Sequence, residues 1–158
     1  MRYKYLVILI FLLLPFSFSL GQTLELLGQK VTFGATLSEQ KNDFWQEGGQ
    51  IESDASYLEV YEGENLDGWF YKKRLVTLDV NMWDNKVCSE MEDLIINLKP
   101  YNLYTIFNEV EILYEIYKTN DYYISRSSSS KSKEYTIIPV KVLENIRRTH
   151  PEYLIKLF

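Results

Sequence analysis

The sequence predicts an α+β fold: a mainly antiparallel sheet of about five to six strands, with about two to four short helices packed on it. Residues 110–117 alternate apolar and polar side chains, as a half-buried strand does. Turn-forming residues separate several segments of this kind, whereas other segments carry apolar residues at helical spacing. Runs of strands with helices inserted between them are typical of a mainly antiparallel α+β domain.

The first part of the chain is expected to form a short edge strand over residues 23–27 and a helix over residues 37–47. Thr36 and Glu39 have the Thr-x-x-Glu spacing in which each side chain satisfies an unpaired backbone donor at a helix start. Apolar residues share one side of the following segment, and a Gly-Gly pair ends it.

The next part is expected to contain a hairpin. Residues 57–61 alternate strictly and predict a strand. Asp67-Gly68 is a typical tight-turn pair, because both residues tolerate the unusual backbone angles of a hairpin. Residues 69–82 predict one long strand, whose apolar residues change from odd to even positions at 72–74. A bulge or bend is therefore expected there.

Residues 85–98 support two structures. Ser89 and Glu92 have capping-box spacing and are followed by apolar residues on one helical face, which favours a helix. Residues 87–91 would alternatively pair with the preceding strand, so helix or strand stays open for residues 88–98. Pro100 suits the first turn of a helix, and residues 100–107 are expected to form a second short helix with an apolar face.

The C-terminal part predicts strands over residues 109–117, 122–126 and 135–138. The intervening segment 127–133, which reads SSSSKSK, is too polar for a core and predicts a mobile hairpin tip. Apolar residues at helical spacing then predict a helix over residues 142–148. A last turn is expected to begin at Pro151.

Residues 1–21 have the layout of a secretory signal peptide. Arg2 and Lys4 precede an apolar run, and the small residues Ser19 and Gly21 stand before Gln22. The run contains a proline and is shorter than the roughly 20 residues that a transmembrane helix needs. We therefore expect export to the periplasm or the exterior, a single domain over residues 22–158 and no stable membrane span after cleavage. An uncleaved N-terminal anchor is the alternative. The chain has no Asn-x-Ser/Thr acceptor, which fits a bacterial exported protein.

The composition excludes several classes of function. The chain has 22 acidic and 17 basic residues, for a net charge of −5, and such a surface repels phosphate backbones, so no nucleic-acid partner is expected. One His and one Cys cannot build a zinc site or a disulfide framework, and neither a metal nor a cofactor is expected. His150 lacks triad partners at a recognisable spacing and is interpreted as a solvated or capping residue. Cys88 is interpreted as a small buried thiol, with intermolecular pairing as the alternative.

The acidic segment 62–68 is a candidate for chemistry. It carries Glu62, Glu64 and Asp67, whose oxygens are of the kind that Ca²⁺ prefers, but its spacing departs from that of an EF-hand loop. The segment is interpreted as an ordinary acidic turn, with a weak ion site as the alternative. Together with Glu59 it would also supply a carboxylate pair for glycoside hydrolysis. Nothing in the sequence indicates the desolvated carboxyl that acid catalysis needs.

The candidate binding residues are Tyr57, Glu59, Tyr61, Trp69 and Tyr71. All stand at odd positions on either side of the predicted Asp67-Gly68 turn, so paired strands are expected to present them on one face. If exposed, such a face stacks on sugar rings or anchors a protein partner at little cost in entropy. Because aromatic residues favour strands in any case, the same residues alternatively form part of the core.

The sequence thus predicts a non-catalytic, exported module that binds a protein or a glycan at the cell envelope. The prediction depends on the absence of a catalytic signature and on the strands rich in Tyr and Trp. Two alternatives remain: a small carboxylate-dependent hydrolase, which only the acidic segment supports, and a structural component of an envelope assembly.

Overall fold

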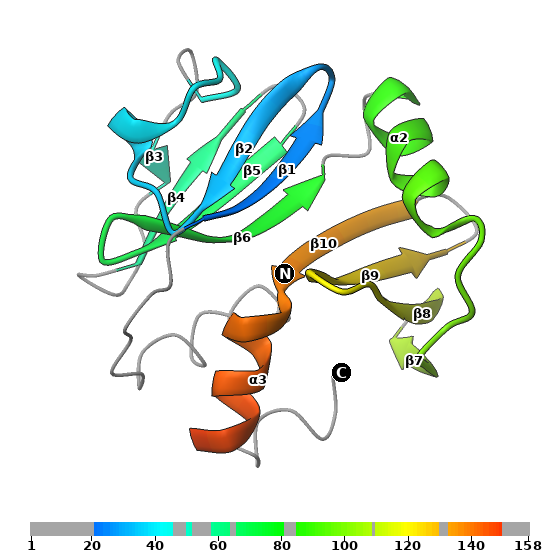
Figure 1. Ribbon diagram of the computed structural model, residues 1–158. Coiled ribbons are helices and arrows are strands. Elements are labelled where there is room, and N and C mark those ends of the chain that lie inside the picture. Colours follow the sequence, from blue (N-terminus) through cyan, green and yellow to red (C-terminus); the bar gives the residue numbers. More distant parts are fainter. Residues whose placement is uncertain are drawn as a thin grey trace.

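The computed structural model describes residues 21–45, 50–51, 58–63, 66–80, 85–108, 110–129 and 133–149 (Figure 1). The described residues form strands, two α-helices and one 3-10 turn. The helical elements are η1 (Leu37–Glu39), α2 (Asn85–Ile95) and α3 (Val140–Thr149). The strands are β1 (Gln22–Leu26), β2 (Gln29–Phe33), β3 (Gln50–Ile51), β4 (Leu58–Glu62), β5 (Leu66–Tyr71), β6 (Arg74–Val80), β7 (Asn102–Asn108), β8 (Val110–Lys118), β9 (Tyr122–Ser128) and β10 (Lys133–Pro139).

Eight strands form one antiparallel sheet in the order β3-β4-β5-β6-β10-β9-β8-β7, and β1 and β2 form a separate hairpin. The sheet consists of two meanders, β3 to β6 and β7 to β10, which are joined where β10 pairs with β6. The expected antiparallel architecture is confirmed. The sheet is larger than the five to six strands predicted, because residues 69–82 contribute to two strands and residues 102–108 form a strand instead of a helix.

The change of parity at residues 72–74, where a bulge or bend within one strand was expected, comes from a hairpin turn between two strands. Lys72 and Lys73 have φ angles of 47° and 65° and connect β5 to β6 as a two-residue hairpin turn, with Tyr71 paired to Arg74. The irregularity in the β5–β6 pairing lies instead between Trp69 and the next residue.

Asp67-Gly68 is not a turn, contrary to the prediction, but lies inside β5. The chain reverses just before it, where the Gly63 N–H donates to the Leu66 carbonyl at 3.0 Å. Gly68 is needed for packing, because a Cβ there would come within 2.9 Å of the Trp45 indole ring. The small residue that suggested a turn instead makes room for an aromatic side chain.

η1 is a single 3-10 turn, whereas the sequence predicted a helix continuing to residue 47. Directly after it, the Gln40 side chain accepts from the Thr32 N–H at 3.0 Å and donates to the Thr32 carbonyl at 2.7 Å. These bonds hold residue 40 along the edge of β2. The capping residues therefore begin a single helical turn, and the helix ends at residue 39. Residues 46–47 lie outside the described part.

The two α-helices follow the sequence pattern. The sequence left residues 88–98 open between helix and strand, and α2 shows that residues 85–95 form a helix. α3 confirms the helix predicted over residues 142–148. The short helix predicted over residues 100–107 is wrong, because this segment forms β7 and pairs with β8 along its whole length. A short apolar pattern fits helix and strand alike, and pairing with a neighbour decides between them.

The main core lies between one face of the sheet and a cover made of the β1–β2 hairpin and α2 (Figure 1). α3 packs on the opposite face of the sheet. The hydroxyl of Tyr123, on β9, donates to Glu144 of α3, whereas Arg126 of the same strand contacts Glu92 of α2. Positions 123 and 126 differ in parity, so their side chains point to opposite faces. The fully buried residues with the largest side chains are Tyr123, Tyr135, Phe70, Leu26, Leu66, Leu75, Leu78, Met91, Ile116 and Ile124.

Several predictions fall outside the described residues. Residues 1–20 and 150–158 are among them, so the signal peptide, the role of His150 and the last turn stay predictions. Cys88 is partly buried and packs against the core cluster. Of the helices that the structure describes, none combines the length and the apolar character needed to cross a membrane.

Candidate functional site

The five candidate binding residues do not share one face of the sheet. Tyr57 lies outside the described residues. In the β4–β5 pairing, Tyr61 stands opposite Gly68, whereas Val60 stands opposite Trp69. Paired residues point to the same face, so Glu59 and Tyr61 lie on one face and Trp69 and Tyr71 on the other. The expected common face is wrong because β4 and β5 pair odd-numbered with even-numbered residues. A role of these residues in binding stays a prediction.

Trp69 and Tyr71 are each only 3% exposed, so for these two rings the interpretation as core holds. Tyr61 is half-buried. Its ring centroid lies 5.2 Å from that of Phe70, and its hydroxyl donates to Glu59 at 3.4 Å. Burial raises the pKa of Tyr61, and the neighbouring Glu59 carboxylate raises it further. The described part of this group therefore offers no stacking platform of several rings.

The face that carries Trp69 also carries two carboxylates. Asp67 is 6% exposed and stands opposite Asp79 in the β5–β6 pairing. The Asp79 carboxylate accepts from Trp69 Nε1 at 2.8 Å and from Thr136 Oγ1 at 2.7 Å. The sequence pointed to a carboxylate pair formed by the acidic segment 62–68 and Glu59, whereas the register places Asp67 of that segment opposite Asp79.

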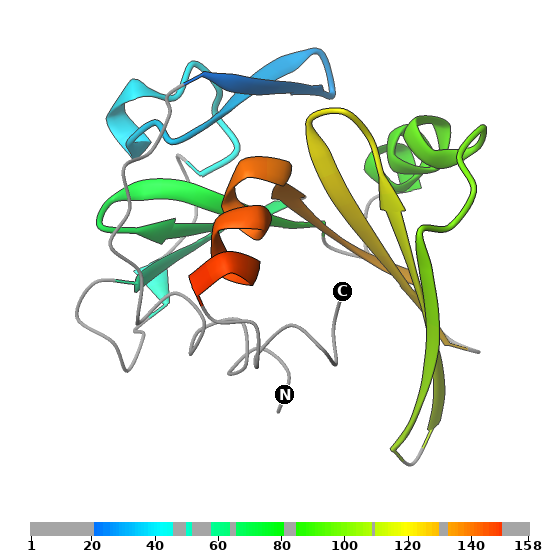
Figure 2. The same ribbon diagram turned by 60° about the horizontal axis from the view of Figure 1, so that its bottom comes forward.

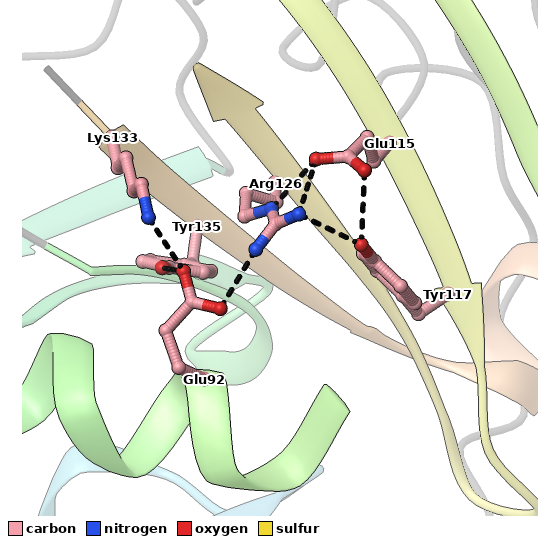
Figure 3. A network of polar contacts seen from close by, with 6 residues as sticks. All are labelled: Glu92, Glu115, Tyr117, Arg126, Lys133 and Tyr135. Atoms are coloured by element: carbon pink, nitrogen blue, oxygen red, sulfur yellow. Dashed lines mark hydrogen bonds and ion pairs between the residues drawn. The ribbon is translucent and has the colours of Figure 1, made fainter. Parts of the chain in front are cut away.

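Arg126 lies at the centre of a polar network that joins α2 to the sheet (Figure 3). Its guanidinium donates from Nε to Glu115 at 2.7 Å and from Nη1 to Glu92 at 2.7 Å. Nη2 donates to the Tyr117 hydroxyl at 3.0 Å, and that hydroxyl donates to Glu115 at 3.1 Å. We call this group the Arg126 network; its members are Glu92, Glu115, Tyr117, Arg126, Lys133 and Tyr135.

Electrostatic interactions keep the acidic and basic groups of the Arg126 network ionised and bonded to one another. Burial alone would raise the pKa of Glu92, but hydrogen bonds from Tyr135 at 2.5 Å, Lys133 at 3.1 Å and Arg126 outweigh it and lower the pKa. Burial also opposes the charge on Arg126, yet the carboxylates of Glu115 and Glu92 hold its pKa above the ordinary value. The pKa of Tyr135 is raised, by burial first and then by Glu92. These groups bind one another, and the arrangement fastens the helix to the sheet rather than presenting a free acid or base.

A second polar group lies where β7 begins. Lys118 Nζ is 3.5 Å from Glu144 and 5.0 Å from the centroid of the Tyr123 ring. The same ammonium lies 5.8 Å from the centroid of Tyr101, a ring that is 54% exposed. Tyr101 thus brings an aromatic surface to the solvent next to a charged pair.

The exposed large apolar side chains of the described residues are concentrated in one short stretch. They are Leu94, Ile96, Tyr101 and Leu103, and they span the end of α2, the connection and the start of β7. Single exposed apolar residues are common, but a concentration of them marks an interaction surface.

β7 is also the long outer edge of the sheet. The other edge, β3, has two residues, whereas β7 has seven, and its sequence NLYTIFN contains no charge, Pro or Gly. Within the part of the chain that the structure describes, no strand pairs with the outer side of β7. Figure 2 shows the green β7–β8 hairpin extending away from β1, β2 and η1. Natural proteins usually protect such an edge with charges, Pro, bulges or a covering segment.

The edge of β2 shows how this protein protects a strand. Gln40 occupies both the N–H and the carbonyl of Thr32, and Asn42 Nδ2 donates to the Lys30 carbonyl at 2.9 Å. At β7 the corresponding bond is local: the Leu103 N–H donates to its neighbour Asn102 Oδ1 at 2.9 Å. Sequence reasoning missed this edge because residues 100–107 were assigned to a helix. Its run of aromatic and β-branched residues was the available signal.

Among the described residues, no group of three or more His, Cys, Asp or Glu side chains is placed to hold a metal ion. No family model, curated protein or solved structure matches this chain. Its function is therefore inferred from the geometry of its own residues.

Proposed function

We propose that this chain is an exported, non-catalytic module that binds a protein partner by taking up an extended segment of that partner at the outer edge of β7. The observation that supports it best is the seven-residue, uncharged edge strand, whose start carries Leu103, the last of the exposed large apolar side chains described above. Strand addition uses the main-chain groups of an open edge for affinity and the neighbouring side chains for specificity.

It can be assigned which residues of β7 direct their backbone N–H and C=O groups towards β8 and which direct them away. The Leu103 N–H bonds to Asn102 Oδ1, which places it on the side away from β8. In an antiparallel pair, alternate residues direct both their N–H and their C=O groups away from the partner. Residues 103, 105 and 107 therefore direct three C=O groups outward. Because Asn102 Oδ1 holds the Leu103 N–H, the outward N–H groups that an added strand would use are those of residues 105 and 107.

A protein partner is favoured over a glycan. Glycan binding was expected to use an aromatic face, but Trp69 and Tyr71 are buried. Among the residues whose side chains the structure describes, Tyr101 is the exposed large aromatic one. An exposed ring beside a strand edge suits a peptide segment, for which the ring covers one side chain while the backbone pairs.

The alternative of a carboxylate-dependent hydrolase draws on Asp67 and Asp79. Cross-strand neighbours have Cβ atoms about 4.5–5.5 Å apart, so their carboxyl groups reach the separation of about 5 Å that retaining glycosidases use. Asp67 is, however, only 6% exposed, and Trp69 beside it is buried, which gives a substrate little access. Turnover of a glycoside panel that disappears in Asp79→Asn would favour this alternative over the binding module.

Thr105→Pro tests the proposed edge. Proline lacks the outward N–H, and its ring obstructs the edge, whereas the bonds between β7 and β8 remain because residue 105 faces away from β8. Peptides are selected from a phage-displayed library of random 12-residue segments on the mature chain, and their affinity is measured by fluorescence anisotropy. We expect Thr105→Pro to weaken selected peptides at least about tenfold, equivalent to about 1.4 kcal/mol.

Glu25→Pro is the matched control. Leu26 and Gln29 flank a two-residue turn, so Glu25, opposite Lys30, directs its N–H outward from the β1–β2 hairpin in the same way. This variant should bind the peptides as the unmodified chain does. Equal binding by Thr105→Pro, or selection of no peptide at all, would contradict the proposed function.

A further inference from the structure

We propose that Asn102 determines the register of a segment bound at the outer edge of β7 and the residue at which its pairing stops. This inference rests on the proposed strand addition and assigns a specificity-determining residue to that site. Asn102 is the first residue of β7, and its Oδ1 accepts from the backbone N–H of Leu103 at 2.9 Å. The first outward N–H of the edge is thus occupied before any partner binds.

The fold does not need this bond to satisfy a buried group. Asn102 and Leu103 are both exposed, and water satisfies an exposed N–H without loss of stability. Asparagine is also an unfavourable residue in a strand, because its short side chain competes with strand pairing for neighbouring backbone groups. The bond therefore affects what can pair with β7 more than it affects the stability of β7 itself.

The backbone on either side of Asn102 is fixed by β8. The Tyr101 N–H donates to the Ile116 carbonyl at 2.6 Å, and Asn102 stands opposite Ile116 in the β7–β8 pairing, which continues without interruption to Asn108. The Leu103 N–H is consequently held on the outer side of the strand. An added strand meets it at a fixed position, where Asn102 already accepts from it.

A single occupied donor is enough to select a register. A uniform edge specifies register weakly, because a segment displaced by two residues makes the same bonds. Along β7 the two positions are not equivalent. Carbonyl groups of a bound segment can accept from the outward N–H groups of residues 105 and 107, whereas a carbonyl opposite residue 103 finds that donor already bonded. Pairing across residues 105 and 107 is therefore favoured, and it stops at Leu103.

The edge of β2 shows that the closure at β7 is only partial. Gln40 occupies both the N–H and the carbonyl of Thr32, so at that residue the β2 edge offers neither group to another strand. At β7 the bond from Asn102 covers a donor alone, and the Leu103 carbonyl still points outward. An edge restricted in this way limits which segments bind without excluding strand addition.

Asn102→Ala tests this assignment, because alanine frees the Leu103 N–H and leaves the strand backbone unaltered. Peptides selected on the unmodified protein, as described above, are titrated into both proteins and followed by fluorescence anisotropy. The displayed segments are longer than the seven residues of β7, so they can bring a carbonyl to the freed donor. One additional hydrogen bond should tighten binding by roughly two- to tenfold.

Amide hydrogen exchange, measured for each residue by NMR, locates the change. In the unmodified protein, bound peptide should slow exchange at residues 105 and 107 by about tenfold or more and leave Leu103 unchanged, because Asn102 already holds that N–H. In Asn102→Ala the peptide should slow exchange at Leu103 as well. A merely structural role of Asn102 would alter Leu103 in the free protein but not its response to the peptide.

Two variants serve as controls. Asn102→Asp keeps an oxygen acceptor at the same position, so its affinity for the peptides and its exchange at Leu103 should match those of the unmodified protein. Asn42→Ala removes a different edge asparagine, whose Nδ2 donates to the Lys30 carbonyl of β2 at 2.9 Å, and it should leave peptide affinity unchanged. Circular dichroism of each variant verifies that the fold is retained.

Failure of this inference is distinguishable from failure of the proposed function. If Asn102→Ala binds the peptides no more tightly and its Leu103 amide gains no protection on binding, the role of Asn102 is overturned, whereas loss of binding in Thr105→Pro still supports strand addition. A Leu103 amide that the peptide protects equally in the unmodified protein also overturns it. If no peptide is selected at all, both proposals fall.

Discussion

Replacing Arg126 by Met should destabilise the fold by about 2–3 kcal/mol. Methionine keeps an unbranched stem but removes the guanidinium, which bonds to Glu115, Glu92 and Tyr117. Removing one partner of a buried ion pair costs about 3–5 kcal/mol because the other charge stays uncompensated, whereas an exposed pair contributes about 0–1 kcal/mol. The Glu115 side chain is 14% exposed and that of Glu92 33% exposed, which places the expected loss between these limits.

Urea denaturation of the protein, followed by tryptophan fluorescence, measures this loss. With a typical slope of about 1–3 kcal/mol per M, the midpoint should fall by about 1 M or more. Lys133→Met is the matched control, since Lys133 bonds to the same Glu92 but its side chain is 54% exposed. Its replacement should cost less than about 1 kcal/mol.

A double-mutant cycle with Glu115→Gln isolates the pair. Because Glu115 keeps only its bond from Tyr117 once Arg126 is gone, the two replacements together should cost about 1–2 kcal/mol less than the sum of the single losses. An Arg126→Met variant within about 0.5 kcal/mol of the unmodified chain, or one no less stable than Lys133→Met, would refute the role assigned to the Arg126 network.

Three further predictions follow from burial and pKa. Trp69→Ala should lower the free energy of unfolding by roughly 3–5 kcal/mol, because the indole is only 3% exposed. Tyr101→Ala should change it by no more than about 0.5 kcal/mol, because the Tyr101 side chain is 54% exposed. Equal losses for the two variants in urea denaturation would contradict this prediction. The pKa of Glu92 in the folded protein lies below its ordinary 4.5, so the stability that its carboxylate contributes is present above pH 4.5 and lost as the pH falls through the folded value. The difference in melting temperature between the unmodified chain and Glu92→Gln should therefore disappear on acidification. A difference that stays constant with pH would contradict this prediction. Burial, and then Asp121, raises the pKa of Tyr122 to about 12, so the stability that the neutral Tyr122 phenol contributes is present below pH 10 and lost as the pH rises through about 12. The Tyr122→Phe variant should therefore lose less stability over that interval than the unmodified chain. Identical alkaline melting curves for the two proteins would contradict this prediction.

Segments with a strong period were predicted well. α2 and α3 have apolar residues at helical spacing, and β8 alternates along its length, so local pattern and tertiary structure agree there. β7 failed because seven residues of mixed apolar character fit either period, and its pairing with β8 is a contact that no local pattern reports.

The candidate site was predicted less well, because a face depends on register as well as on alternation. Tyr61 and Trp69 both stand at odd positions, but their strands pair odd with even residues, so the two side chains lie on opposite faces. Gly68 shows a related limit: it lies in a strand because Trp45 packs against it, and position 45 is 23 residues away in sequence.

The sequence by itself determined the mainly antiparallel α+β architecture and the helix over residues 142–148, because these follow from periods of apolar residues that any compact fold must bury. It also determined the exclusions that depend on composition, such as a disulfide framework in a chain with one Cys. Only the tertiary structure decided which residues share a face, that Arg126 meets Glu92 across 34 residues, and that β7 is the longer edge strand of the sheet formed by the described residues. The physical reason is that pairing, register and edge position are relations between distant segments, whose free energy arises from contacts formed only when the whole sheet assembles.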